Sequence, residues 1–491
     1  MKKILILLLG VLLAFGAFSG CAGMYRPQQG VGGGNDEMLG NIELSPDSSF
    51  EGKLRIAAPK VASHQSALNA FIRSFEEKYP KIEVQAEYLD LNSYKASIGR
   101  VAASAVNNPS IMYDVFWLAQ DYVNEWIDLD ILSPLEQLMD KDSHFDRNDI
   151  NAQMLKLCTV KDSVYMMPRD YNQVVMFYNK RMFDVARVDY PKDGMTGAEF
   201  KEMCSKLARN FLKDNEKKND YGVLYKEAVS CIVDCNVAWS SLDYPLVKSF
   251  GGSVVNEAGE VVFESEQTAN AIRYWKDLVE TKEDRIRLAI DLVSGADKQG
   301  VQFRMQQAPI YLHSRSVMSD LLNEETIGGQ TYKGIGDGNL GVAALPNFGG
   351  TYAVGAGCSG YAMYKNCANG TAAWQFLKHV VSIEGQNAYS ETGDCVPVRN
   401  SLLNDTGAAW RTCLPGKLSQ DFHHDAFIYQ MDKACATNDF YPYIPFKSQA
   451  YVTARIEEAF RSCIQGNNDM FAANLRSAAD KMKNDIAQAL K

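Results

Sequence analysis

The chain has 491 residues, 46% of them hydrophobic, and a formal net charge of -10 at pH 7. This acidic balance argues against nucleic acid as a partner, because a protein that binds phosphates along a strand needs a basic surface. It leaves a neutral small ligand open, since net charge affects solubility and steering rather than fold.

The N-terminus has the plan of a secretory signal peptide over residues 1–20. Lys2 and Lys3 precede an apolar stretch over residues 4–18, which is shorter than the roughly 20 residues that a transmembrane anchor needs. Phe18-Ser19-Gly20-Cys21 resembles the bacterial lipobox, although Phe18 replaces the usual Leu. We therefore expect cleavage after residue 20 and a diacylglycerol on the Cys21 sulfur, which anchors the exported protein to the cell membrane. Loss of Lys2 and Lys3 changes the net charge from -10 to -12.

Residues 21–50 contain few large apolar side chains and include the run Gly32-Gly33-Gly34. This composition is typical of a flexible tether. No later segment has the length and apolar character of a membrane span. About 440 residues follow the tether, which is too many for one hydrophobic core and enough for two lobes.

The folded body opens with a β-α-β pattern. Alternating apolar residues predict strands over 54–58 and 82–88, and the helix between them has Leu68, Phe71 and Phe75 on one face. Pro80 ends this helix. A largely apolar run over 111–118 predicts a further, buried parallel strand. The chain is therefore expected to form open α/β sheets.

Ligands of open α/β sheets bind beyond the carboxyl ends of the strands, where the connecting loops diverge. This rule points to residues 60–64 and 117–122. Trp117 could instead be a core residue, and Asp121 could be a helix cap. The candidate ligand-binding residues in these two segments are Lys60, His64, Trp117 and Asp121.

Three further helical regions can be placed. Thr196 and Glu199 form a capping box before an apolar helical pattern. Residues 372–381 are expected to be helical, and so are residues 451–490, with a break near Gly466.

Cysteine and histidine give no metal site. Ten cysteines besides Cys21 could pair in an exported protein, but their spacing fixes no connectivity, and they could equally be small buried hydrophobes. Cys231 and Cys235 lack the Cys-x-x-Cys spacing. The six histidines show no metal-ligand spacing, so we expect no metal and no other cofactor.

The run from Gly355 to Gly360 satisfies the dinucleotide fingerprint G-x-G-x-x-G. Its context does not fit, because Tyr361 and Met363 predict a strand where the fingerprint requires a helix. The glycines are expected to form a tight turn near the ligand, where Ser359 could donate a hydrogen bond.

Several segments, in this order, resemble the sugar-binding, maltose-binding-protein-like group of extracellular solute-binding proteins of ABC importers. They span most of the mature chain. The segments are Phe75-Glu76-Glu77-Lys78-Tyr79-Pro80, Met167-Pro168-Arg169 followed by Phe177-Tyr178-Asn179-Lys180, Gly341-Val342-Ala343-Ala344-Leu345-Pro346, Ala372-Ala373-Trp374-Gln375-Phe376-Leu377, and Val396-Pro397-Val398-Arg399.

The resemblance implies a two-lobed periplasmic-binding-protein-like fold of type II. Each lobe would have an open α/β sheet, and hinge strands would cross between the lobes. Lobe one would contain residues 51–167 and 340–390, and lobe two residues 168–339 and 391–491.

The same resemblance implies further ligand-binding residues around the cleft between the lobes. Arg315 departs from the aromatic residue that the family often has there, and with Arg169 it suggests a carboxylate or phosphate on the ligand. Turns, surface ion pairs and core packing are the alternative interpretations. These candidates are Arg169, Asp170, Tyr171, Asn172, Trp239, His313 and Arg315. Apart from the resemblance, Tyr443 in the C-terminal part could add an aromatic stacking surface, with a packing role as the alternative.

Aromatic faces and planar polar groups are what carbohydrate binding requires. We therefore expect a monomeric carrier that captures a mono- or oligosaccharide by hinge closure and delivers it to the permease of an ABC importer. Two alternatives stay open. One is a carrier of the same fold for an acidic sugar, a phosphorylated polyol or a polyamine; the other is a lipoprotein glycoside hydrolase or adhesin, although no pair of carboxylates is singled out.

Overall fold

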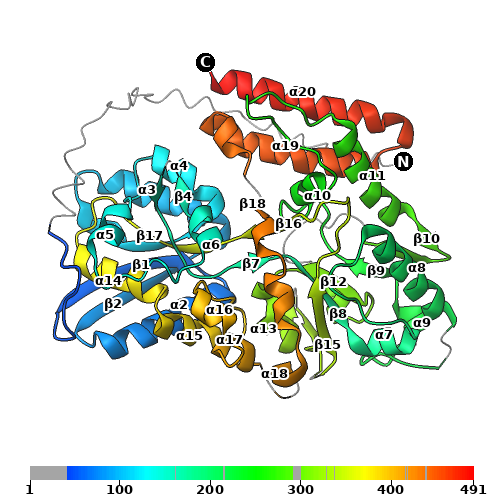
Figure 1. Ribbon diagram of the computed structural model, residues 1–491, viewed down its shortest axis with the longest axis horizontal. Helices are drawn as coiled ribbons and strands as arrows, with labels where there is room; N and C mark the ends of the chain where they lie inside the picture. The colour runs from blue at the N-terminus through cyan, green and yellow to red at the C-terminus, as the bar shows by residue number, and fades with distance from the viewer. Residues whose placement is uncertain are drawn as a thin grey trace, which may run out of the picture.

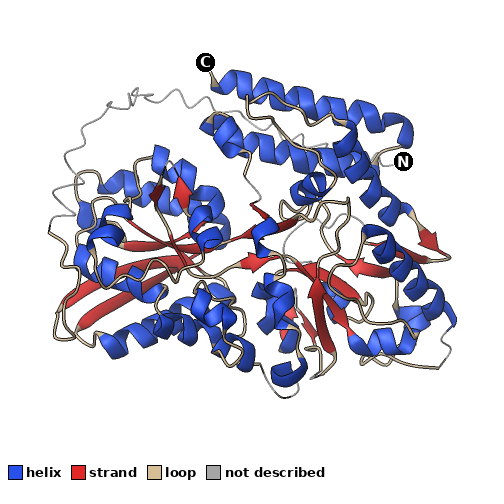
Figure 2. Cartoon of the chain, in the orientation of Figure 1, coloured by secondary structure: helices blue, strands red, loops and turns tan. Residues whose placement is uncertain are grey.

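The computed structural model describes residues 41–491 apart from 161, 214–215, 291–299, 328, 337, 415, 417 and 437–438. It has two bodies, each with a central sheet flanked by helices, and strands in the middle of the molecule connect them (Figure 1, Figure 2). This is the two-lobed α/β arrangement that the sequence predicted. The expected signal peptide and Cys21 lie outside the described residues.

Lobe one, as we name the first body, has a five-stranded sheet in the order β2-β1-β3-β17-β6. β1 is parallel to β2 and β3, whereas β17 is antiparallel to β3 and β6. Leu54 and Ile56 of β1 are fully buried, as their alternation predicted. The strands are β1 (Gly52–Pro59), β2 (Ile82–Leu89), β3 (Val115–Ala119), β6 (Met167–Pro168) and β17 (Ser359–Met363), with a separate hairpin of β4 (Thr159–Val160) and β5 (Ser163–Val164).

Helices cover the sheet of lobe one through their apolar faces. Phe71 of α2 packs edge-on against Tyr361 of β17, and Phe75 packs edge-on against Phe376 of α14. The predicted helices before Pro80 and near residue 372 are thereby confirmed. The helices are α2 (Ala62–Lys78), α3 (Tyr94–Ala105), α4 (Val123–Asp128), α5 (Glu136–Lys141), α6 (Ala152–Leu157), α14 (Gly370–Val380) and α15 (Ile383–Ser390).

The expected strand over 111–118 is shorter than predicted, because β3 begins only at Val115. Residues Pro109–Ile111 form a 3-10 turn instead. Proline has no N–H to donate and fixes its own φ, so it favours this turn over an early start of the strand.

Lobe two, the second body, has a six-stranded sheet in the order β10-β11-β9-β12-β8-β15. β9 is parallel to β11 and β12, and β8 is antiparallel to β12 and β15. A separate hairpin consists of β13 (Glu325–Ile327) and β14 (Gln330–Tyr332). The strands of the sheet are β8 (Val175–Asn179), β9 (Cys231–Asp234), β10 (Lys282–Glu283), β11 (Ile286–Ala289), β12 (Ile310–His313) and β15 (Leu340–Ala344).

The helices of lobe two include the predicted capping box. Thr196 donates to Glu199 through its N–H and its Oγ1, both at 2.8 Å, and the Glu199 N–H donates back to Thr196 Oγ1 at 3.2 Å. The two C-terminal helices lie side by side above α10 and α11 (Figure 1), with the predicted break at Gly466. The helices are α7 (Lys180–Ala186), α8 (Gly197–Lys213), α9 (Tyr225–Ala228), α10 (Asp243–Ser249), α11 (Glu266–Glu280), α12 (Val301–Arg304), α19 (Phe446–Gln465) and α20 (Phe471–Ala489).

Three segments cross between the lobes and form a small sheet, the crossing sheet, in the order β18-β16-β7. β7 (Asn172–Gln173) leads from β6 to β8, β16 (Val354–Gly357) leads back to β17, and β18 (Ala434–Ala436) precedes α19. The predicted hinge strands are thus present.

The glycines of the G-x-G-x-x-G run lie in the strands β16 and β17, so the expected tight turn is wrong. Gly355 belongs to β16 and Gly360 to β17. A Cβ would lie 2.0 Å from the Ser241 carbonyl oxygen at Gly355, and 2.0 Å from the Met167 carbonyl oxygen at Gly360. Glycine is needed there because another backbone approaches closely. The strand predicted at Tyr361 and Met363 is confirmed.

Two segments depart from the expected lobe boundaries. β15 pairs with β8 in the six-stranded sheet, so the chain returns to lobe one only through β16. Trp410 and Phe427 are buried in a core cluster that contains residues of β1 and β3 and also residues of β8 and β15, and the Phe427 ring centroid lies 5.9 Å from that of Phe177 in β8. Three short helices belong to this region: α16 (Asn400–Asn404), α17 (Ala409–Thr412) and α18 (Leu418–Asp421). A fourth, α13 (Met318–Leu322), follows β12 and contacts Asp394 through Ser319.

The last residues of the expected tether pack on lobe one. Ile42 is buried in its core. The Leu44 carbonyl oxygen accepts hydrogen bonds from Lys378 Nζ at 2.7 Å and from Gln375 Nε2 at 3.0 Å. Ser45 contacts His144 through a hydrogen bond of 2.9 Å. Hydrogen bonds and burial therefore fix the chain to the lobe from about residue 41. Within the described part of the chain, no helix combines the length and the apolar character that crossing a bilayer requires.

Candidate ligand-binding site

The lobe-one side of the site is an aromatic cluster around Trp117, the middle residue of β3. His64 of α2 meets the Trp117 ring edge-on at a centroid distance of 4.7 Å, and Tyr94 meets it at 5.6 Å. The Tyr94 hydroxyl also donates to the Trp117 carbonyl oxygen at 2.8 Å. Trp117 is only 6% exposed, which agrees with the core alternative, yet its Nε1 donor has no hydrogen-bond partner among the described residues.

His64 is held neutral in this cluster. Burial, and secondly the charge of Arg169, lower its pKa to about 2. Its Nδ1 is buried and lacks a hydrogen-bond partner within the described structure. A neutral imidazole can donate from one nitrogen and accept at the other, so His64 suits a hydroxyl group of a neutral ligand.

The lobe-two side of the site is a stack of three aromatic rings. Trp239 lies nearly parallel to His313, with ring centroids 4.8 Å apart and 19° between the planes. The His313 ring also stacks with the Tyr311 ring, and their centroids are 5.4 Å apart. Burial lowers the pKa of His313 to about 4, so this ring is also neutral at physiological pH. Trp239 is half-buried and presents an aromatic surface.

The crossing sheet brings the two aromatic sides together. Ser359 of β17 pairs with Ala119, two residues after Trp117, and Asn172 of β7 pairs with Gly357. His313 pairs with Val175, three residues after Asn172. Asn172 therefore lies between the two sides, and its buried Oδ1 has no hydrogen-bond partner among the residues described.

Arg169 and Asp170 form a buried ion pair beneath the crossing sheet, with Arg169 Nε 3.2 Å from Asp170 Oδ2. The Tyr389 hydroxyl donates to the same carboxylate oxygen at 3.0 Å, and the Arg169 guanidinium lies 5.6 Å from the Tyr389 ring centre. Ser359 donates weakly to Asp170 Oδ1, from its N–H at 3.4 Å. These contacts order the start of the lobe crossing and give each charge a counter-ion, but Arg169 Nη1 is buried without a hydrogen-bond partner in the described structure.

Tyr171 and Arg315 are fully buried and contact protein groups. The Tyr171 hydroxyl donates to Gln173 Oε1 at 2.9 Å. All three Arg315 nitrogens are engaged: Nε donates to Gly393 O at 2.9 Å, Nη2 to Trp410 O at 2.6 Å, and Nη1 lies 3.0 Å from His424 Nδ1. The idea that Arg315 meets an anionic ligand finds no support in this placement, because its side chain has no exposed surface.

The remaining candidates lie at the edges of the site. Lys60 is exposed at the end of β1, and Asp121 is exposed in the 3-10 turn Gln120–Tyr122. Tyr443, at 45% exposure, lies on a cavity of about 760 Å³ that both lobes line. Across this cavity Asn124 Nδ2 of α4 donates to Gln449 Oε1 of α19 at 3.3 Å. Sequence analysis missed Asn124 and Gln449, because single amides within helices give no pattern.

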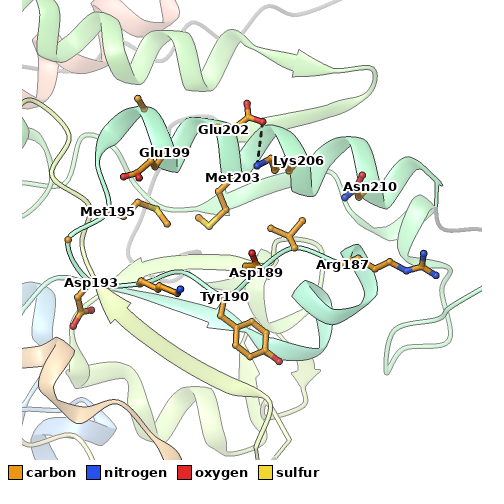
Figure 3. Close-up of a pocket in the computed structure, with 14 residues that line it drawn as sticks. Arg187, Asp189, Tyr190, Asp193, Met195, Glu199, Glu202, Met203, Lys206 and Asn210 are labelled. Carbon is orange, nitrogen blue, oxygen red and sulfur yellow. Dashed lines mark ion pairs between the residues drawn. The ribbon is translucent and has the colours of Figure 1, made fainter.

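A second groove, of about 880 Å³, lies on lobe two between the loop over 187–195 and α8 (Figure 3). It contains none of the predicted ligand residues. Glu202 and Lys206 pair with each other at 3.8 Å along α8, and Glu199 caps the same helix. The acidic groups of its α8 wall are thus engaged within their own helix, and we do not assign a ligand to this groove. Among the described residues no cluster of three or more potential metal ligands occurs.

A comparison with known protein families identifies the family of this chain. Residues 70–412 match the family of bacterial extracellular solute-binding proteins. The chain belongs to this family. A comparison with curated protein sequences gave no match.

Solved structures agree with the solute-binding fold. The GacH receptor of Streptomyces glaucescens, solved unliganded and with acarbose, is 18% identical with a TM-score of 0.67, over 89% of this chain and 99% of that one. An ABC substrate-binding protein of Listeria monocytogenes in complex with cycloalternan is 15% identical with a TM-score of 0.66, over 89% and 100%. Maltose-bound MalE3 of T. maritima is 18% identical with a TM-score of 0.65, over 88% and 99%. At these identities the likeness concerns the fold.

Proposed function

We propose that this solute-binding protein captures a carbohydrate between its lobes and delivers it unaltered to an ABC importer. The observation that carries the proposal is the combination of stacked aromatic rings and unpaired polar atoms at the lobe crossing. Trp117 Nε1, His64 Nδ1 and Asn172 Oδ1 are buried without partners in the described structure. Such atoms are costly unless a ligand or water satisfies them. The hydroxyl groups of a sugar would do so, while its C–H face would pack on an aromatic ring such as Trp239.

The ligand class is supported by chemistry and by likeness. Both site histidines are neutral, and protein groups engage all three nitrogens of Arg315. Arg169 has its counter-ion in Asp170, although its Nη1 is buried without a hydrogen-bond partner among the described residues and could donate to a ligand hydroxyl. A neutral polyhydroxylated ligand therefore fits better than an anion. The three structural neighbours are complexes with acarbose, cycloalternan and maltose, all carbohydrates or their analogues.

Ligand capture would use the crossing sheet as its hinge. In this proposal lobe one consists of residues 41–168 and 358–414, and lobe two of residues 175–354 and 439–491. The segment around Phe427 lies between them and packs on Phe177 of β8. Closure would bring Trp239 and His313 toward Trp117 and His64, so that both sides contact one ligand. A lipid on Cys21 would hold the monomeric carrier near its permease, with residues 22–40 as the tether.

A ligand screen tests the proposal. The mature protein is tested by thermal shift against a panel of mono- and oligosaccharides, and against phosphorylated polyols, acidic sugars and polyamines. A true ligand at a hundred times its dissociation constant should stabilise the fold by about 2.7 kcal/mol. Binding of a polyamine or phosphorylated compound in preference to every neutral sugar would contradict the carbohydrate proposal. Release of shortened glycans by the pure protein would contradict delivery without chemical change.

The anchor is tested separately. Mass spectrometry of the protein extracted from membranes should find an acylated N-terminal Cys21. An unmodified or uncleaved N-terminus would remove the anchor from the proposal without affecting the binding site.

A further inference from the structure

Cys158 and Cys358 have their sulfur atoms in contact although 200 positions separate them in the chain. The two Sγ atoms are 3.5 Å apart, and both side chains are buried. We propose that Cys158 and Cys358 form a disulfide bond in the exported protein. This inference is independent of the identity of the ligand.

The positions of the two residues favour a bond. Cys158 caps the end of α6, and Cys358 stands between β16 and β17. A disulfide has an S–S distance of about 2.0 Å, so the sulfur atoms need to approach by about 1.5 Å, which side-chain rotation and small adjustments can supply. Disulfides persist in the oxidising compartments to which an extracellular solute-binding protein is exported.

The bond would fasten the base of the hinge. The chain leaves lobe one through β6, a few residues after Cys158, and returns to it through β16, directly before Cys358. All six strands of the lobe-two sheet lie between the two cysteines in sequence. The bond would therefore close a loop that contains the sheet of lobe two, and such a cross-link restricts the unfolded chain strongly.

The bond would leave lobe closure possible. Cys158 ends α6 and Cys358 directly precedes β17, which pairs with β3, so both stand on lobe one and the cross-link would not connect one lobe to the other. Rotation about β7, β16 and β18 would remain available to the oxidised protein. We therefore expect similar ligand affinity in the oxidised and reduced forms.

Burial decides when the bond can form. The contact with Cys158 and burial raise the pKa of the Cys358 thiol, and thiol–disulfide exchange requires a thiolate. Oxidation should thus occur during folding, before the core of lobe one closes. The two thiols lose two protons and two electrons, and an exported protein disulfide or oxidised glutathione accepts them and becomes two thiols.

Peptide mapping tests the proposal directly. Trypsin releases residues 157–161 with Cys158 as their one cysteine, and residues 334–365 with Cys358 as theirs. The protein is exported to an oxidising bacterial periplasm, alkylated under denaturing conditions and digested without reductant. We expect the two peptides to appear linked, two hydrogen masses below their sum, and to separate after reduction. Both peptides alkylated before reduction, or either one linked to another cysteine, would overturn the proposal.

A stability measurement supplies the second test. The chain is refolded with oxidised glutathione or with a reductant, and the double variant Cys158→Ala, Cys358→Ala is treated in the same way. The wild type should melt several degrees higher when refolded with oxidant, whereas the double variant should melt at one temperature in both conditions. The pair Cys204→Ala, Cys463→Ala in lobe two removes two buried cysteines and should keep the difference. Equal melting temperatures of oxidised and reduced wild type would overturn the proposal.

Discussion

Trp239 and His313 stack nearly face to face, with ring centroids 4.8 Å apart and an angle of 19° between their planes. His313 fixes one face of the indole, so the exposed part of the Trp239 ring is held ready for a sugar. The variant Trp239→Ala should therefore bind carbohydrate more weakly by about 0.5–1.5 kcal/mol, up to about tenfold, measured by isothermal titration calorimetry.

The matched control for this variant is Tyr190→Ala. Tyr190 is a partly exposed aromatic residue of lobe two that lines the groove beside α8, which contains none of the aromatic residues of the site (Figure 3). Its loss should leave the affinity unchanged. Equal affinities of Trp239→Ala and the wild type, with an intact fold, would remove Trp239 from the site.

Trp117→Phe separates the hydrogen bond from the packing. Phenylalanine keeps an aromatic ring beside His64 but removes the Nε1 donor, which has no partner in the described structure. We expect a loss of ligand affinity of about 0.5–1.5 kcal/mol, the net value of one hydrogen bond. Without ligand, Trp117→Phe should lose less stability than variants of the other tryptophans, because this substitution breaks no existing hydrogen bond. Thermal melts with and without ligand measure both effects. If the ligand raises the melting temperature of Trp117→Phe as much as that of the wild type, Trp117 Nε1 makes no hydrogen bond to the ligand.

The affinity for ligand should be constant between pH 8 and about pH 5. His64, with a pKa lowered to about 2 by burial and by Arg169, and His313, with a pKa lowered to about 4 by burial, are both neutral over this range. Ligand binding then requires neither residue to gain or lose a proton. Titration calorimetry at several pH values checks this expectation. A tenfold change in affinity centred near pH 6.5 would show that a histidine of the site titrates normally.

Fold stability should respond to the same histidines with a definite sign. A histidine whose pKa is lower in the folded than in the unfolded chain favours folding above about pH 6.5, and this contribution is lost as the pH falls. Each such histidine lowers the free energy of unfolding by up to about 1.4 kcal/mol for every pH unit below pH 6.5. The variant His64→Gln should therefore show a shallower loss of urea stability between pH 7 and pH 5 than the wild type. If the stability of the variant falls with pH as steeply as that of the wild type, His64 has the same protonation in the folded and the unfolded chain.

Asp170→Asn should destabilise the fold severely. Asp170 is fully buried and accepts hydrogen bonds from Arg169 Nε and the Tyr389 hydroxyl. The asparagine would leave the buried charge of Arg169 without its counter-ion, at a cost of about 3–5 kcal/mol. Tyr389→Phe removes one hydrogen bond only and should cost about 1 kcal/mol. Urea denaturation compares the two, and a stability of Asp170→Asn equal to that of Tyr389→Phe would contradict this role for the ion pair.

The periodic parts of the fold could be predicted from the sequence. The alternation of Leu54 and Ile56, the helical face of Phe71 and Phe75, and the capping box of Thr196 and Glu199 are local patterns, and each produced the expected element. The carboxyl-end rule also led to Trp117, which lies beside His64 but in the middle of β3, because the strand continues to Ala119. These features depend on neighbours in the chain, so a single sequence carries them.

Features that depend on distant segments could not be predicted. The strand end at His313 and Arg315 looked like one polar cluster, but only His313 reaches the aromatic stack. The chain around Trp410 and Phe427 returns from nearly a hundred residues away to cover Arg315. The pairing of β15 with β8, which moves a lobe boundary, is also long-range and leaves no local mark.

The contact between Asn124 and Gln449 belongs to the same class of feature. Each amide lies in a helix of a different lobe, and neither has a spacing or neighbour that marks it. Only the approach of α4 to α19 makes them a pair. Their role can therefore be studied only once the arrangement of the lobes is known.

A crystal structure of the mature protein with its best-binding oligosaccharide would measure the position of the ligand directly. We expect the sugar between the lobes, with a hydroxyl oxygen within hydrogen-bond distance of Trp117 Nε1 and a ring packed on Trp239. A saturated crystal with the sugar bound elsewhere, or with the space between these two tryptophans closed in every state, would contradict carbohydrate capture at the lobe crossing.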